Sequence, residues 1–354
     1  MKLVVRQKPR LACRSGNSIN GTEYYKHQIL YHTTLELTPQ YIHQVGLSEI
    51  AKIKTDIRNV VRQIHSTGDN LLSPTWTMQK IFSTIRQHDP FFYDTDDEEG
   101  IVVSVRNILK TITQKMDKAF TADIIAGGDT GLDIVTGGGS MGSYIASQGQ
   151  GDNGTFYIGT SSTLSKLKMR ALVCHEAMPG HHYQFSLLHK HALFSKLSAA
   201  RVEYSVSTEG WSLYAELLCG EMGVMEVKSP DLPASYSTLY YQLGVLSMQL
   251  VRAARLVIDT GLHAKGWSRD QAVSYFTRHT DVRQDLVESE VDRYITYPGQ
   301  ALSYYLGLIE VRQLRLELAN KMGESFDIRQ FHKIILSAGS VPLPTLRRYV
   351  RDMF

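Results

Sequence analysis

Apolar side chains recur at helical spacing along much of this chain. Between Ile50 and Ile64 they return every three or four residues, which predicts a helix with one buried face, and Ser48 precedes them as a candidate N-cap. Ser73-Pro74 favours the start of another helix, because proline fits the first helical turn, and Asp89-Pro90 favours its end. The N-terminal part of the chain is therefore expected to be helical.

A further helix is expected over residues 100–119, and the acidic run from Asp94 to Glu99 precedes it. We interpret this run as a solvated turn whose carboxylates favour the N-terminal end of that helix, where the helix dipole is positive. The patterns divide the chain into a tail at 1–20, a helical part at 21–121 and a remaining part at 122–354. A single continuous domain is expected.

The composition changes between residues 122 and 163, where glycine, serine and threonine are frequent and Gly137-Gly138-Gly139 stands in the middle. No lysine follows at the position that a phosphate-binding loop requires, so we expect short strands here. Gly154 to Ile158 contains side chains that favour β-structure. An exposed strand edge could pair with an extended peptide, although an ordinary hairpin fits as well. From residue 165 the chain is again predicted to be helical, which gives a mostly α fold with a small β-sheet.

The segment His175-Glu176-Ala177-Met178-Pro179-Gly180-His181-His182 carries the densest chemistry of the chain. Three imidazoles and one carboxylate within a few residues are the ligand types of a catalytic zinc site. Neutral imidazoles hold the ion, and a nearby glutamate takes a proton from the water that the ion activates. The sequence therefore predicts Zn²⁺ as the cofactor, His175 as a ligand and Glu176 as the general base.

The spacing leaves the second histidine ligand open. On an ideal helix His182 would lie near the face of His175, whereas a break at Pro179-Gly180 would bring in His181 instead. Proline cannot donate to the carbonyl of His175, and it disfavours a helical conformation for the residue before it. We therefore favour a bulge that leaves a His-Glu-x-x-His arrangement with His181 as the second ligand, and we keep His182 as the alternative.

A third protein ligand is needed, because catalytic zinc sites usually have three and keep one position for water. The segment that follows offers Glu209 and Glu216, which are seven residues apart and hence lie on one helix face. Ser207 and Thr208 are candidate helix caps, which would put Glu209 in the first turn. We choose Glu209 as the ligand, although either glutamate could instead orient a ligand from behind.

Several blocks of the chain together resemble the domain-of-unknown-function 885 family, which is grouped with the zincin-like metallopeptidases. The resemblance extends from about residue 20 to the C-terminus, and it implies a mostly helical, gluzincin-like catalytic domain with two histidines and a glutamate on zinc. Family members typically begin with a longer helical region, which this chain is expected to lack. The matching blocks, in family-like order, are Gly154-Thr155-Phe156-Tyr157-Ile158, His175 to Gln184, Glu209 to Glu216, Arg252 to His263, Arg293-Tyr294-Ile295, Pro298-Gly299-Gln300-Ala301, Ser303-Tyr304 and Phe331-His332.

A peptidase also needs a donor for the negative charge that develops on the scissile carbonyl oxygen. Tyr304 is the first candidate, and His263 and Arg293 are further candidates. Arg293 could alternatively clamp a substrate carboxylate, which would indicate carboxypeptidase action. Arg255 and Asp259 lie one turn apart on a predicted helix, so a buried ion pair between them is as well supported as a catalytic role.

Composition and charge restrict the other functions. Of the 354 residues, 43% are hydrophobic, which is enough for a sizeable core, and the small net charge of +3 comes from scattered basic residues, which argues against nucleic-acid binding. The chain lacks an apolar run of about 18 residues that could span a membrane, and its first residues lack the hydrophobic core of a signal peptide. Three widely spaced cysteines, Cys13, Cys174 and Cys219, indicate reduced thiols and a cytoplasmic location.

The function predicted from the sequence is a zinc-dependent hydrolase that cleaves peptide bonds in a peptide substrate. Two alternatives stay open: a metal-dependent amidase or esterase that acts on a small molecule, and an inactive helical interaction protein derived from a peptidase. Zinc content and hydrolysis of amides would separate them. The sequence indicates neither an oligomeric state nor whether such a peptidase trims chain ends or cuts within chains.

Overall fold

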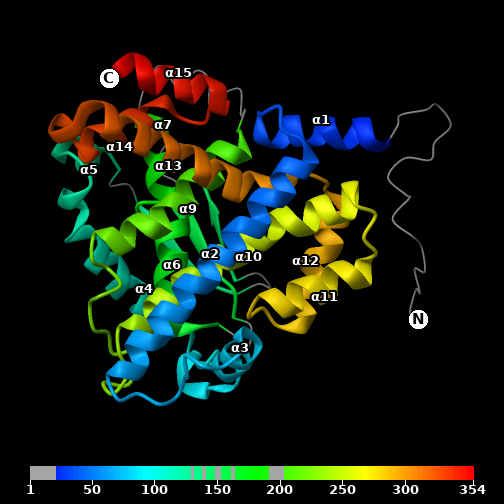
Figure 1. The fold of residues 1–354 in the computed structure, drawn as a ribbon. Coiled ribbons are helices and arrows are strands. Elements are labelled where there is room, and N and C mark those ends of the chain that lie inside the picture. The colour runs from blue at the N-terminus through cyan, green and yellow to red at the C-terminus, as the bar shows by residue number, and fades with distance from the viewer. Residues whose placement is uncertain (1–20, 129–130, 138–140, 148–152, 161–163, 191–202) are drawn as a thin grey trace.

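The structure is a computed structural model and describes residues 21–128, 131–137, 141–147, 153–160, 164–190 and 203–354 (Figure 1). The expected tail at 1–20, with Cys13, lies outside these residues. The described part is predominantly helical with one small sheet, which confirms the mostly α prediction. The helices are α1 (Gly21–Thr33), α2 (Pro39–Ser66), α3 (Met78–Gln87), α4 (Glu98–Thr113), α5 (Ala122–Gly128), α6 (Lys166–Glu176), α7 (His181–Lys190), α9 (Ser205–Glu221), α10 (Leu239–Ala264), α11 (Arg269–His279), α12 (Gln284–Thr296), α13 (Ser303–Met322), α14 (Ile328–Ala338) and α15 (Leu343–Met353).

Two of the predicted helix starts are wrong. The stripe from Ile50 to Ile64 belongs to α2, but this helix begins at Pro39, and the Thr38 side chain caps it by accepting from the Tyr41 backbone N–H. A threonine cap followed by proline at the first helical position is a stronger start signal than Ser48, which lies inside the helix. In the same way α3 begins at Met78 after a Thr77 cap, not at Ser73-Pro74.

The acidic run before α4 behaves as predicted. The Asp97 side chain caps α4 by accepting from the Gly100 backbone N–H, and Glu98 and Glu99 occupy the first turn. The helix ends at Thr113, earlier than expected, and a short 3-10 turn at Met116–Lys118 follows it. The Asp97 carboxylate therefore accepts a hydrogen bond from a backbone N–H at the start of α4, and the negative charges of Glu98 and Glu99 complement the positive end of the helix dipole.

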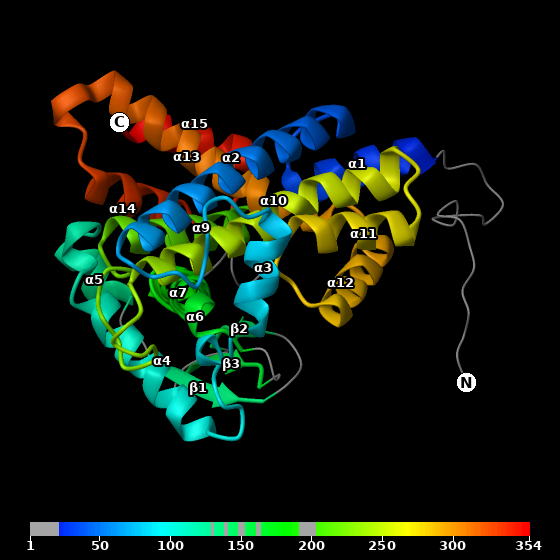
Figure 2. The ribbon, with the colours of Figure 1, turned by 60° about the horizontal axis from the view of Figure 1, so that its bottom comes forward.

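The sheet has three strands in the order β1-β3-β2, where β1 is Leu132–Thr136, β2 is Gly142–Ile145 and β3 is Gly154–Ile158. β3 pairs in parallel with β1 and in antiparallel with β2. The strand predicted at Gly154–Ile158 is therefore present, but it is the central strand of the sheet, so it does not itself offer an edge to a peptide. Figure 2 shows the sheet against α4 and α6, both of which contact it.

The core is built from long helices that approach each other closely. α2 packs along α10, α9 packs along α13, and α6 contacts both α9 and α10. At two crossings a glycine permits this approach: a Cβ atom on Gly46 would lie 2.7 Å from a methyl carbon of Val257, and one on Gly210 would lie 2.5 Å from the Gly307 Cα. α6, α9, α10 and α13 therefore form one packed group, around which the remaining helices are arranged (Figure 1).

A disulfide joins Cys174 on α6 to Cys219 on α9. The prediction of reduced thiols is therefore wrong for these two cysteines. They are 45 residues apart, so the packing of α6 on α9 brings them together and the spacing alone does not reveal it. The expectation of a cytoplasmic location rested on reduced cysteines and loses that support. Among the described helices, none combines the length and the apolar composition needed to cross a membrane.

Candidate metal centre

The histidine motif lies at a break between two helices. α6 ends at Glu176, and α7 begins at His181, with a cis Met178–Pro179 peptide bond in the turn between them. Gly180 is required in this turn, because a Cβ atom there would lie only 1.9 Å from the carbonyl oxygen of His175. The predicted interruption at Pro179-Gly180 is thus present as a complete break between helices.

The turn is attached to α9 by a buried hydrogen bond. The indole Nε1–H of Trp211 donates to the carbonyl oxygen of Pro179 at 2.8 Å. Trp211 is two residues after Glu209, and Gly210 between them forms the close crossing with α13. α9 begins at Ser205, so Ser207 and Thr208 lie inside the helix and do not cap it as predicted. The Glu209-Gly210-Trp211 segment therefore fixes the carboxylate relative to the histidine turn.

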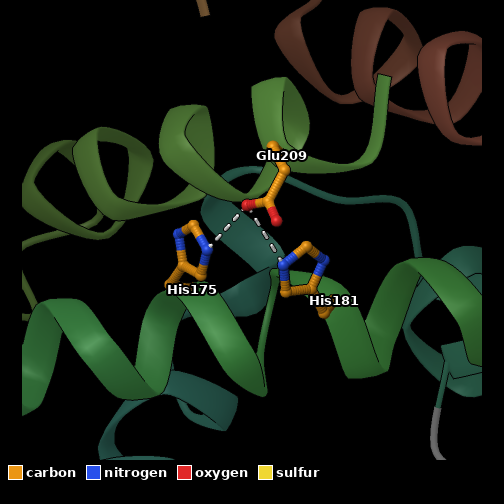
Figure 3. Close-up of side chains that lie close together, drawn as sticks. All are labelled: His175, His181 and Glu209. Atoms are coloured by element: carbon orange, nitrogen blue, oxygen red, sulfur yellow. Dashed lines mark hydrogen bonds and ion pairs between the residues drawn. The ribbon is translucent and has the colours of Figure 1, made fainter. Parts of the chain in front are cut away.

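Three of the predicted metal ligands come together (Figure 3). His175 Nε2 lies 3.2 Å from Oε2 of Glu209, and His181 Nε2 lies 3.5 Å from the same oxygen. The ligand atoms of the three residues all lie within 4.8 Å of one another. His175 projects from α6, His181 from the first turn of α7, and Glu209 from α9 on the opposite side.

This arrangement fits a zinc ion. Ligands held at about 2.1 Å in tetrahedral geometry lie about 3.4 Å from one another, and the observed separations of 3.2 Å and 3.5 Å are close to that value. Two imidazoles and one carboxylate are also a donor set that catalytic zinc accepts, with one position left for water or substrate. His175, His181 and Glu209 could therefore hold the ion with little rearrangement.

A second carboxylate supports His175 from behind. Nδ1 of His175 lies 2.9 Å from Oε1 of Glu216, a residue with no exposed surface. Gln249 on α10 donates to the other Glu216 oxygen at 3.2 Å, and the Arg252 guanidinium lies 3.6 Å from Oε1. The short Nδ1–Oε1 distance puts the Glu216 carboxylate behind the ring, on the side away from Nε2, where a carboxylate can orient a histidine that binds a metal ion. Glu216 thus lies behind His175, whereas Glu209 lies between the two histidines.

The charges around His175 favour its protonated form when no metal ion is bound. Burial disfavours the charged form of His175, but the contacts with Glu209 and Glu216 outweigh it and raise the pKa of His175 to about 9. Burial alone would raise the pKa of Glu209, whereas His181 and His175 hold it well below its usual range. An ionised Glu209 is the form that could bind a cation, and a metal ion at this site would replace the proton of His175.

His182 and Glu176 occupy distinct positions beside the three residues. The Nδ1 atom of His182 lies 3.1 Å from the hydroxyl of Tyr144 on β2, so this ring is engaged with the sheet. Glu176 is the last residue of α6 and is 7% exposed, and its charge contributes to the raised pKa of His175. The structure therefore brings His181, and not His182, toward Glu209, and it leaves the carboxylate of Glu176 next to the centre.

Of the three predicted oxyanion donors, Tyr304 is the one that the structure places beside Glu209. It lies one turn before Gly307, whose backbone packs directly against that of Gly210, next to Glu209. Burial and the nearby charge of Glu209 raise the pKa of the Tyr304 phenol, which keeps its hydroxyl protonated as a donor. The ring also stacks with the Arg255 guanidinium, whose central carbon lies 4.4 Å from the ring centre.

The other two candidates are placed differently. His263 lies near the end of α10, about 16 Å along the helix axis from Arg252, and its Nε2 atom lies 2.9 Å from the carbonyl oxygen of Tyr294. Arg293 bonds to both carboxylate oxygens of Glu290 at 3.0 Å, and to the Gln300 side chain at 2.6 Å. Neither residue contacts the three candidate ligands among the described interactions.

The expected Arg255–Asp259 ion pair is absent from the described part of the chain. Arg255 instead binds Glu290 at 3.0 Å, while Asp259 accepts hydrogen bonds from the Tyr25 hydroxyl and the Gly299 backbone N–H. Burial raises the pKa of Asp259. Residues four apart on a helix can form an ion pair, but here Asp259 binds Tyr25 and Gly299 and Arg255 binds Glu290 instead. Sequence reasoning missed Glu290 and Trp211, because their partners are distant along the chain and no local pattern signals them.

The comparisons with known proteins agree with this fold. The family model described as "Bacterial protein of unknown function (DUF885)" matches residues 4–350. A crystal structure of a "putative lipoprotein" from Colwellia psychrerythraea has a TM-score of 0.83 and 29% identity, covering 94% of this chain and 55% of that one. A "putative lipoprotein of unknown function" from Shewanella oneidensis has a TM-score of 0.69 and 19% identity, covering 92% and 59%. The chain thus spans little more than half the length of these proteins. No curated protein matches.

Proposed function

The chain belongs to the DUF885 family, and we propose that it is a zinc-dependent hydrolase that cleaves peptide bonds. The observation that carries this proposal is the convergence of His175, His181 and Glu209 at distances suited to zinc. Glu176 follows His175 directly in α6, and its charge acts on the His175 ring. Carboxylates adjoining a metal centre commonly serve as general bases in hydrolysis. When bound, zinc would polarise the substrate carbonyl and lower the pKa of water.

The residues around the centre have separable roles in the proposed reaction. Glu176 accepts a proton from the attacking water and returns it to the leaving amine. The Tyr304 hydroxyl donates a hydrogen bond to the substrate carbonyl oxygen as negative charge develops there. Glu216 keeps the His175 ring in position and takes no part in proton transfer.

The sheet offers a place for the substrate backbone. β2 lies at one edge of the sheet, in the strand order β1-β3-β2. Tyr144 on β2 contacts His182, the neighbour of His181. A peptide that lay along this side of the sheet would therefore run beside the metal centre.

Two measurements test the proposal. Purified protein loaded with zinc is analysed for metal content and assayed on a panel of peptides, simple amides and esters. A Glu176→Gln variant keeps the shape of the side chain but cannot accept the proton, so we expect zinc content and folding to be unchanged and the rate to fall at least about 100-fold.

A Glu221→Gln variant is the matched control, because Glu221 is half exposed on α9 and pairs with Arg315 away from the centre. We expect it to retain activity. Full activity of Glu176→Gln would contradict the role of Glu176 as the base. Turnover of esters or simple amides but not of peptides would favour a non-peptidase hydrolase, and bound zinc without any turnover would favour an inactive protein.

A further inference from the structure

Two arginines and one glutamate lie together next to Tyr304. Glu290 on α12 accepts from Arg293 and from Arg255, each at 3.0 Å, and from the hydroxyl of Tyr294 at 2.6 Å. Two guanidinium groups thus share one carboxylate. The three side chains leave one positive charge without a partner among themselves, and they are at least two-thirds buried.

One guanidinium has a donor group to spare. Nε of Arg255 donates to Tyr294 and Nη2 donates to Glu290, whereas Nη1 is buried and has no hydrogen-bond partner among the described residues. A buried, charged donor without a partner is costly, and native structures rarely leave one unless a ligand or water supplies the acceptor. Arg293 differs, because its Nη1 is already bound to Gln300.

The Arg255 guanidinium is linked to the metal centre through Tyr304. The Arg255 guanidinium stacks on the ring of Tyr304, which in turn lies beside Glu209. Arg252, one turn earlier on α10, reaches Glu216 behind His175. Two neighbouring arginines of α10 thus contact the two clusters: Arg252 contacts Glu216 behind His175, and Arg255 binds Glu290 and stacks on Tyr304.

We propose that Arg255, held by Glu290, Tyr294 and the Tyr304 ring, binds the terminal carboxylate of the substrate, so that the enzyme acts at the C-terminal end of peptides. This proposal rests on the proposed peptidase function. Arginine matches a carboxylate because its planar N–H groups meet the two oxygens with paired, charge-assisted hydrogen bonds. Glu290 balances one of the two arginines and leaves the other free for the substrate.

The test compares a peptide with a free C-terminal carboxylate and the same peptide with a C-terminal amide. We expect the zinc-loaded protein to cleave the acid roughly 10- to 100-fold faster in kcat/KM, and an Arg255→Gln variant to lose most of this preference. Arg269→Gln is the matched control, since Arg269 forms an exposed ion pair with Asp292 and should keep the preference. Arg255→Lys retains the charge with fewer donors and should show an intermediate preference if Arg255→Gln does not fold.

Binding provides a readout that does not need turnover. In the Glu176→Gln background, calorimetry should show that the acid binds roughly 10-fold or more tightly than the amide, and that Arg255→Gln removes the difference. Equal rates and equal binding of acid and amide, or a preference that survives Arg255→Gln, would overturn the proposal. If neither peptide is cleaved but binding still depends on the carboxylate and on Arg255, the peptidase function fails while the carboxylate site stands.

Discussion

At the scale of single residues, two glutamates on one helix contact different nitrogens of the same histidine ring. Glu209 and Glu216 are seven residues apart on α9 and both face His175, but they meet different nitrogens of its ring. Glu216 is fully buried and supported by Gln249, whereas Glu209 lies between the two histidines. The ring nitrogen that each contacts therefore makes Glu209 the candidate ligand and Glu216 the candidate support.

Zinc affinity should depend on pH through His175. Contacts with Glu209 and Glu216 raise its pKa to about 9, so below that pH the ring carries a proton that zinc must displace. We therefore expect zinc to bind about tenfold more tightly for each unit of rising pH between about 7 and 9. Competition against a chelator of known zinc affinity measures this. An affinity that is flat over that range would contradict the raised pKa.

The choice between His181 and His182 shows what residue-level reasoning could predict. The presence of Pro179-Gly180 was sufficient to predict a break after Glu176, and His181 was the favoured partner. The direction of each ring depends on contacts that the spacing does not contain. Trp211 holds the Pro179 carbonyl and Tyr144 engages His182, and both partners come from other parts of the chain.

At the scale of elements, the close crossing of α9 and α13 positions the site. Gly210 and Gly307 allow the two backbones to touch, next to Glu209 on α9 and one turn after Tyr304 on α13, and the charge of Glu209 acts on the Tyr304 phenol. The sequence predicted that the chain from residue 165 onward, which contains both helices, is helical. It did not predict the crossing, because a glycine inside a helix is by itself only a weak helix former.

Gly210→Ala should destabilise the protein and weaken zinc binding. The added methyl would meet backbone atoms of Gly307 at 2.5 Å, and backbone atoms cannot move aside as a flexible side chain would. We expect a loss of about 1–3 kcal/mol in the free energy of unfolding. Denaturant unfolding of the metal-free protein measures the first effect, and zinc titration measures the second.

Gly220→Ala on the same helix is the control for this substitution. A Cβ atom at Gly220 would meet nothing within 4 Å, so alanine should be neutral or should stabilise the helix by about 0.5–1 kcal/mol. Equal effects at Gly210 and Gly220 would show that the crossing is looser than described.

At the scale of the whole molecule, the fold is held by links between distant segments. The Cys174–Cys219 disulfide joins the two helices that supply the candidate metal ligands His175 and Glu209, and the α2–α10 contact joins the N-terminal helices to them. The mostly α fold with a small sheet was predictable from periodicity and composition. The disulfide was not, since two cysteines 45 residues apart show no pattern, and the pairing arises only when α6 and α9 pack.

Breaking the disulfide should lower stability. A Cys174→Ser/Cys219→Ser variant frees a loop of 45 residues in the unfolded chain, so we expect a loss of about 2–4 kcal/mol in the free energy of unfolding. Denaturant unfolding in oxidising and reducing buffer measures it. Reductant should lower the midpoint of the parent protein and leave that of the variant unchanged. If the denaturant midpoint of the parent protein is the same with and without reductant, the disulfide does not form in solution.

The most direct test of the proposed function is to locate zinc in a crystal of the zinc-loaded protein by anomalous scattering at the zinc edge. The proposed centre predicts one strong peak per chain, about 2.0–2.2 Å from Nε2 of His175, Nε2 of His181 and the carboxylate of Glu209. A fully loaded crystal with no peak there, or with a peak coordinated by His182 in place of His181, would contradict it.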